Sequence, residues 1–170
     1  RRFFTNALKV SFFATKSVSV LTSTIAVLSP STRTSTRPSA AILVAILDSV
    51  YEKWYGGEHS SPELLKESVY GLCELYRDKV KDARLVGNPG CYTTCSILGA
   101  YPVLASGLGD SRNIIVDAKS GVTGAGRSLS LGTHFCECTE NTKAYKVATH
   151  RHTSEIEQEL SKAAGEEVMI

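Results

Sequence analysis

Cys91 is the residue of this sequence that is best placed to act as a nucleophile. Residues 83–87 read Ala-Arg-Leu-Val-Gly, which is typical of a short strand, and residues 88–90 read Asn-Pro-Gly, which is typical of a turn. A helix is predicted to begin at Cys91, and the unpaired N–H groups and dipole at a helix N-terminus stabilise a thiolate. The alternative interpretation is a small buried hydrophobic residue, which is the ordinary fate of an unpaired cysteine.

The helix that begins at Cys91 is expected to have one apolar face. Its apolar positions continue at Tyr101, Leu104 and Leu108, a spacing that fits one side of a helix. Pro102 is expected to kink this helix or to end it early, because proline lacks the N–H donor that the next turn needs.

A second group of side chains that could exchange protons lies at residues 149–157, Thr-His-Arg-His-Thr-Ser-Glu-Ile-Glu. His150 and His152 flank Arg151, and histidine is the side chain whose charge changes most readily near neutral pH. A cysteine with a distant histidine is the general composition of a site for thiol-based acyl transfer. Taken alone, these residues are more typical of a solvated helix start.

A helix is predicted to follow the two histidines. Ser154 and Glu157 form a capping-box pattern, and Gly165 is a plausible stop. The apolar face of this helix is predicted to consist of Ile156, Leu160 and Ala163.

Between the two reactive clusters lies a strand-like run, residues 113–118, followed by a glycine-rich segment, residues 119–127. A flexible loop that is rich in N–H donors can wrap a phosphate or a cofactor. Glycine-rich loops are also often only turns, so this segment does not by itself distinguish a phosphate- or cofactor-binding loop from an ordinary turn.

Seven separate blocks of the sequence occur in an order and at a spacing that resemble one known family. The blocks are residues 51–56, 69–72, 88–92, 116–121, 124–127, 131–136 and 150–153. They resemble the N-acetyl-gamma-glutamyl-phosphate reductases, the arginine-biosynthesis members of the semialdehyde dehydrogenase group. The resemblance runs from about residue 49 to the end of the chain.

The resemblance implies an α/β fold that passes into an α+β fold. Residues 49–88 would be the tail of a Rossmann-type NADP domain, in which residues 62–66 start a helix that is capped by Ser61. Residues 89–170 would be the first part of a glyceraldehyde-3-phosphate-dehydrogenase-like catalytic and dimerisation domain. In that domain, helices pack on one face of a mostly antiparallel or mixed sheet.

The resemblance also implies a reaction, the NADPH-dependent reduction of N-acetyl-glutamyl 5-phosphate to the 5-semialdehyde and phosphate. The Cys91 thiolate would attack the acyl phosphate and form a thioester, which NADPH would then reduce. His150 is the candidate acid/base, and backbone N–H groups at the start of the Cys91 helix would steady the oxyanion.

The same resemblance assigns the remaining site residues. The candidates for binding the carboxylate and amide of the substrate are Arg151, His152 and Glu155. The candidates for the nicotinamide side of an NADP(H) site are Ser120 and Gly121.

Residues 1–48 depart from this family. They contain no glycine, six Lys or Arg residues, many Ser and Thr, and no acidic residue before Asp48. The phosphate-binding turn of the family needs glycine, so we expect no cofactor site in this segment. We leave it unassigned and expect it to be disordered or out of frame, with an organellar transit peptide as the alternative. The chain is accordingly expected to be a fragment from the middle of the enzyme.

Composition restricts the class of protein and its partners. A chain of 170 residues that is 42% hydrophobic and 21% charged can bury one ordinary core. The net charge of +2 does not indicate a nucleic-acid partner, and the apolar run at residues 40–47 is too short to span a bilayer. The expected partner is a small acyl phosphate. The resemblance implies a homo-oligomer in the complete enzyme and a cytoplasmic location, or an organellar one if residues 1–48 are a transit peptide.

The five cysteines argue against a secreted disulfide framework, because their number is odd, and indicate a reducing compartment. A zinc site could be drawn from His134, Cys136 and Cys138 together with His150 and His152. The Cys-x-Cys spacing is tight and no Cys-x-x-Cys pair accompanies it, so we predict no metal.

Two other functions stay open because the glycine-rich turn is missing. One is a catalytically inactive fragment of the reductase that lacks the cofactor site. The other is a cofactor-independent thiol acyltransferase or hydrolase that keeps Cys91 and His150.

Overall fold

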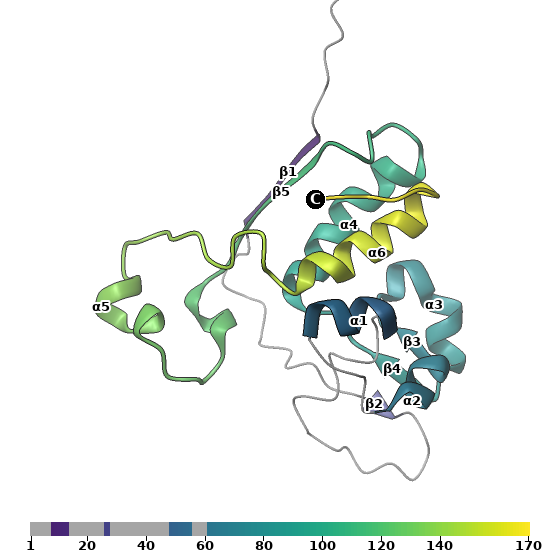
Figure 1. The fold of residues 1–170 in the computed structure, drawn as a ribbon, viewed down its shortest axis with the longest axis horizontal. Coiled ribbons are helices and arrows are strands. Elements are labelled where there is room, and N and C mark those ends of the chain that lie inside the picture. The colour runs from purple at the N-terminus through teal and green to yellow at the C-terminus, as the bar shows by residue number, and fades with distance from the viewer. Residues whose placement is uncertain (1–7, 14–25, 28–47, 56–60) are drawn as a thin grey trace, which may run out of the picture.

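The computed structural model describes residues 8–13, 26–27, 48–55 and 61–170, with side chains for 51–54 and 61–170. In chain order the elements are β1 (Leu8–Phe13), β2 (Ala26–Val27), α1 (Asp48–Tyr55), α2 (Pro62–Glu67), β3 (Ser68–Tyr70), α3 (Cys73–Asp82), β4 (Leu85–Gly87), α4 (Cys91–Ala105), β5 (Ile114–Lys119), η2 (Val122–Ala125), η3 (Leu131–Thr133), α5 (Phe135–Cys138) and α6 (His152–Ala164). Figure 1 shows a helical body around α4 and α6 and a separate lobe around α5.

The strands form two small sheets. In the first, β3 and β4 are parallel and are joined through α3, while β2 pairs with β4 in the antiparallel direction, giving the order β2-β4-β3. In the second, β1 and β5 are parallel. Mixed helices and strands with a small parallel sheet agree with the α/β expectation, and β4 and β5 confirm the strands predicted near residues 83–87 and 113–118.

Strands β1 and β2 lie in the segment that we expected to be disordered. The other predictions for residues 1–48 fall outside the described residues, apart from the first residue of α1. Among the described residues, no helix combines the length and the apolar composition that crossing a bilayer requires.

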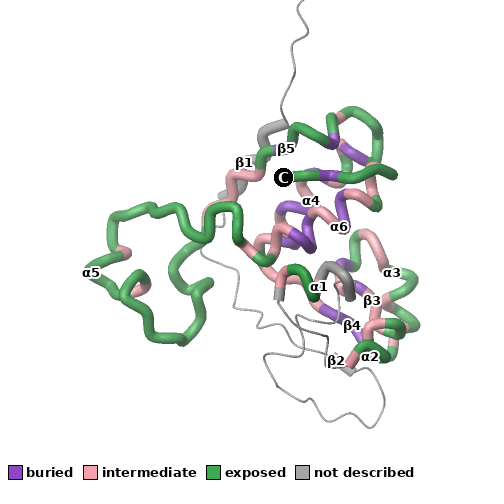
Figure 2. Tube along the Cα trace, in the orientation of Figure 1, coloured by how far each residue is buried: buried purple, intermediate pink, exposed green. Residues whose placement is uncertain are grey.

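The hydrophobic core lies where α4 and α6 pack together, as the buried segments in Figure 2 show. The predicted apolar face of α6 is confirmed, since Ile156 and Leu160 are buried and Ala163 is half-buried. The buried residues of this core are Tyr70, Leu72, Ile97, Ala100, Leu104, Ile114, Ile156, Leu160 and Val168. It therefore crosses the boundary that we expected between residues 88 and 89.

Three predictions about helix ends differ from the structure. Ser154 does not cap α6, because the helix begins two residues earlier at His152, and Ser154 Oγ instead donates to Arg151 O at 2.9 Å. Ser61 occupies the N-cap position of α2 but makes no capping hydrogen bond through its side chain. Leu108 does not extend the apolar face of α4 and is exposed, because the helix ends at Ala105 and the chain turns at Gly107 with φ +69°.

Few side chains are buried in the lobe that contains α5. From residue 120 to residue 149 every residue is exposed except Thr133 and Cys138, and Figure 2 shows this segment standing apart from the helical body. The chain returns from the lobe to α6 through residues 139–151, which carry three left-handed residues other than glycine: Glu140, Lys146 and Ala148.

Candidate active site

Cys91 is the first residue of α4 and has an exposed, unpaired thiol. The turn before it fixes this position, since Thr94 N donates to Gly90 O at 2.9 Å and Thr93 Oγ1 donates to the same oxygen at 2.8 Å. The predicted helix start is therefore confirmed. The exposure of the thiol argues against the alternative of a small buried hydrophobic residue.

Four rings gather beside the start of α4. His150 and His152 lie 4.7 Å apart between ring centroids, and Tyr92, the residue after Cys91, lies 5.3 Å from His150 and 6.2 Å from His152. Tyr145 comes from the loop before α6 and lies 5.6 Å from His150 and 6.4 Å from Tyr92. The structure thus brings both predicted histidines to the residue next to the candidate nucleophile.

His152 lies against the peptide that precedes Cys91. A Cβ atom built on Gly90 would come within 2.8 Å of His152 Cε1 and 3.0 Å of its Nε2. The Nδ1 atom of His152 is buried and has no hydrogen-bond partner among the described residues. His150 is tied to His152 directly, because His152 N donates to His150 Nδ1 at 3.2 Å.

Both imidazoles are held in the neutral form at neutral pH. Burial, together with the neighbouring His150 and Lys146, lowers the pKa of His152 to about 4. Burial, and then Lys146 and Arg151, also lower the pKa of His150. Neutral imidazoles can accept a proton, but the lowered pKa values make both rings weaker bases than free histidine.

The other predicted substrate-binding residues have different environments. Arg151 is exposed at the N-cap of α6. Glu155 is only 3% exposed and accepts a hydrogen bond of 2.7 Å from Tyr70 Oη, so its side chain points into the protein. Burial, and then the nearby Glu159 carboxylate, raise the pKa of Glu155 to about 7, although the Tyr70 bond opposes this. A contact of Glu155 with substrate stays a prediction.

Ser120 and Gly121, the predicted nicotinamide-side residues, lie directly after β5 and are exposed. Ser120 Oγ donates to Gly121 O at 3.1 Å. In the described part of the chain, no three or more His, Cys, Asp or Glu side chains are grouped so that they could hold a metal ion.

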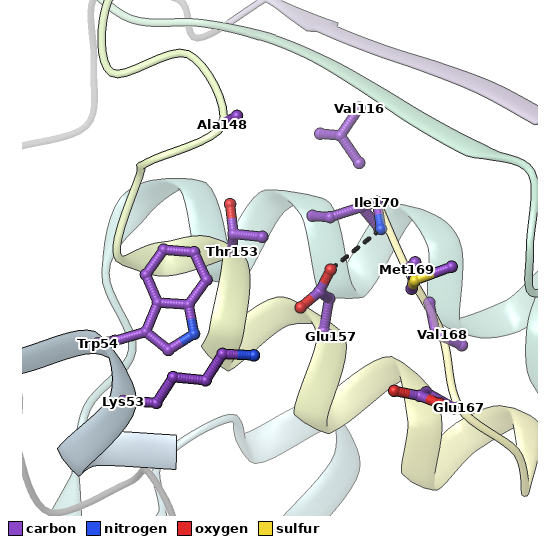
Figure 3. A pocket seen from close by; sticks show the side chains of 10 residues that line it. All are labelled: Lys53, Trp54, Val116, Ala148, Thr153, Glu157, Glu167, Val168, Met169 and Ile170. Carbon is purple, nitrogen blue, oxygen red and sulfur yellow. Dashed lines mark hydrogen bonds between the residues drawn. The ribbon is translucent and has the colours of Figure 1, made fainter.

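A cavity of about 500 Å³ lies between α1, β5, α6 and the C-terminal segment, as Figure 3 shows. Trp54 and Lys53 line one side, and Glu157, whose Oε1 accepts a 3.2 Å hydrogen bond from Ile170 N, lines another. None of the predicted site residues lines this cavity, so the candidate site is the open surface at Cys91.

The chain is similar to known proteins over 71% of its length. Residues 91–170 match the semialdehyde dehydrogenase dimerisation domain. The chain is 60% identical over 121 residues to the N-acetyl-gamma-glutamyl-phosphate reductases of Acetivibrio thermocellus and Syntrophobacter fumaroxidans, and 56% identical over 120 residues to that of Campylobacter jejuni. Over residues 91–170 the chain is therefore similar to the dimerisation domain of semialdehyde dehydrogenases. The aligned segment is 71% of this chain but 35% of each relative, so the chain spans about a third of the length of these relatives.

The family resemblance predicted from the seven blocks is thereby confirmed. Two residues of this candidate site were not identified from the sequence. Tyr92 could have been noticed because it adjoins Cys91, but nothing in the sequence connects Tyr145 with His150. Their contact depends on how the loop before α6 returns to the body of the protein.

Proposed function

We propose that this chain carries the nucleophile and the acid/base groups of an NADPH-dependent N-acetyl-glutamyl-phosphate reductase of arginine biosynthesis. The observation that carries the proposal is an exposed cysteine at the N-terminus of α4 whose two neighbours in the sequence, Gly90 and Tyr92, lie against neutral imidazoles. A thiolate there would attack the acyl-phosphate carbonyl and release inorganic phosphate, leaving a thioester on Cys91.

In this proposal the two histidines divide the proton transfers, which differs from the expectation from the sequence that His150 performs both and His152 binds substrate. His150 Nδ1 accepts a bond from His152 N, so the neutral His150 ring carries its proton on Nε2. This Nε2–H suits His150 to donate to the oxyanion that develops on the substrate. His152 lies nearer the peptide before Cys91. Its lowered pKa keeps the ring neutral, so that it can accept the thiol proton, but also makes it a weaker base than free histidine.

Binding of the remaining groups follows from exposure and charge. Arg151 is the cation that we assign to the substrate carboxylate, since it is exposed beside both histidines in the sequence. Ser120 and Gly121 are assigned to the edge of a nicotinamide. NADPH supplies the hydride when it is bound. Among the described residues, no glycine-rich turn joins a strand to a helix in the way that binding of its pyrophosphate requires.

The larger assembly belongs to the same proposal. The β3-α3-β4 unit supports residues 49–88 as the tail of a Rossmann-type domain. The match to a dimerisation domain supports a homo-oligomer of the complete enzyme. The five unpaired thiols support a reducing compartment such as the cytoplasm.

A chimera tests the proposal. The 121-residue aligned segment of the Acetivibrio thermocellus relative is replaced by the matching segment of this chain, and NADPH oxidation is followed with N-acetyl-glutamyl 5-phosphate. We expect substrate-dependent oxidation that Cys91→Ser abolishes. The 170-residue chain alone is expected to be inactive with NADPH. Hydrolysis of activated esters without NADPH, combined with an inactive chimera, would favour the thiol hydrolase instead.

A further inference from the structure

The ring of Tyr145 is placed against the candidate acid/base rather than in the core. Its centroid lies 5.6 Å from that of His150 with the ring planes at 73°, an edge-on arrangement. Tyr92 meets the same imidazole from α4 at 5.3 Å and 84°. His150 therefore contacts two tyrosine rings, one from α4 and one from the loop before α6.

Burial of apolar surface does not explain where Tyr145 lies. The side chain is 53% exposed, and Val147, two residues later, is 74% exposed. A residue packed mainly for hydrophobic stability would lose far more of its accessible surface. The contact with His150 and Tyr92 is thus what distinguishes Tyr145 from the other exposed side chains of this loop.

The backbone after Tyr145 is bent so that its ring faces His150. Lys146 and Ala148 adopt left-handed conformations, with φ +47° and +56°, and Thr149 N donates to Lys146 O at 3.0 Å to close the turn. Such a conformation costs a residue other than glycine roughly 1–2 kcal/mol. Residues of this kind gather at functional sites, where surrounding contacts hold them in place.

We propose that Tyr145 is a positioning residue of the Cys91 site, whose ring, with that of Tyr92, holds the His150 imidazole in its orientation. This positioning role rests on the proposed function only for the proton transfer that the oriented imidazole then performs. The ring edges fix the plane of His150 while His152 N fixes its Nδ1 atom. The Nε2–H of His150 is left to face the substrate.

The test measures the titration and tautomer of His150 and does not measure catalysis. The groups that face His150 are Tyr92 of α4, His152 of α6, and Tyr145, Lys146 and Arg151 of its own loop. Ring proton and nitrogen resonances of the four histidines are recorded against pH in the unaltered 170-residue chain and in Tyr145→Ala, Tyr145→Phe and Val147→Ala. The resonances of His134, in the exposed lobe, serve as an internal reference.

Tyr145→Ala is expected to raise the pKa of His150 toward its ordinary value of 6.5, because burial is what mainly lowers it. Without the Tyr145 ring the His150 imidazole should also turn away from the His152 N–H donor, so the same variant should mix the two neutral tautomers of His150. Tyr145→Phe and Val147→Ala should keep the original pKa and tautomer. Tyr145→Leu replaces the alanine variant if that one fails to fold.

Two results would overturn the role of Tyr145. One is an unchanged His150 titration and tautomer in Tyr145→Ala, and the other is a change in Tyr145→Phe as large as that in Tyr145→Ala. Neither readout requires NADPH or substrate, so an inactive chimera alongside the expected His150 shifts would reject the proposed reductase function and retain the positioning role.

Discussion

The imidazole of His152 fits against Gly90 because Gly90 has no side chain. A Cβ atom there would lie 2.8 Å from His152 Cε1, closer than non-bonded carbon atoms approach. This contact joins the residue before the candidate nucleophile to the first residue of α6.

Gly90→Ala should therefore displace His152. Gly90 has φ −77°, which alanine adopts readily, so the effect comes from the collision and not from the backbone. We expect a loss of about 1–3 kcal/mol in the free energy of unfolding, as in overpacked cores, and slower alkylation of Cys91. Urea unfolding and timed labelling with iodoacetamide measure the two effects.

Gly132→Ala is the matched control for this variant. Its added Cβ would meet Ser130 Oγ at 3.8 Å, an ordinary contact, so neither property should change. Equal effects of the two substitutions would contradict the interpretation of the Gly90–His152 contact.

Tyr70 supports the helix that carries His152. Its hydroxyl donates to Glu155 at 2.7 Å, and Tyr70→Phe would leave this buried carboxyl group without that donor. We expect a loss of about 1–3 kcal/mol in the free energy of unfolding. Tyr76→Phe should cost less, because Glu159 also accepts from Lys162 Nζ at 2.6 Å and from Gln158 Nε2 at 3.0 Å. Equal losses in urea unfolding would show that the additional partners of Glu159 do not matter.

Glu155→Gln should change how stability depends on pH. The pKa of Glu155 is about 7 in the folded chain and 4.5 is its ordinary value, so between these values the folded chain binds more protons at this group. Ionisation of Glu155 therefore lowers the free energy of unfolding as pH rises from about 4.5 to about 7.

Glutamine does not titrate, so the stability of Glu155→Gln relative to the unaltered chain should increase across the same pH window. Urea unfolding below, within and above that window measures the difference. Glu74→Gln, at an exposed position of α3, is the control and should stay parallel to the unaltered chain. If the free energy of unfolding of Glu155→Gln also changed with pH in the same way as that of the unaltered chain, Glu155 would have no raised pKa.

Local signals predicted the elements that carry the site, but not its packing. The turn before Cys91 and the left-handed Gly165 marked helix ends that the structure confirms. The prediction that Ser154 caps α6 was wrong because a cap is recognised in a sequence only from its local pattern. In the structure a turn at His150 starts α6 earlier. Glu155 looked available to substrate, yet its partner Tyr70 lies 85 positions away in the sequence. Contacts of that kind depend on the tertiary fold, as does the meeting of Tyr145 with His150.

The relative reactivity of the five thiols tests the role of Cys91 as nucleophile most directly. Cys73, Cys91 and Cys136 are all exposed, so exposure alone predicts similar alkylation rates for the three. The helix N-terminus and the adjacent imidazoles predict that Cys91 reacts first and that His152→Asn slows it. Limiting iodoacetamide followed by peptide mapping, with urea-unfolded chain as the reference, should therefore label Cys91 ahead of all the others. Labelling of Cys73 or Cys136 as fast as that of Cys91 would contradict this role.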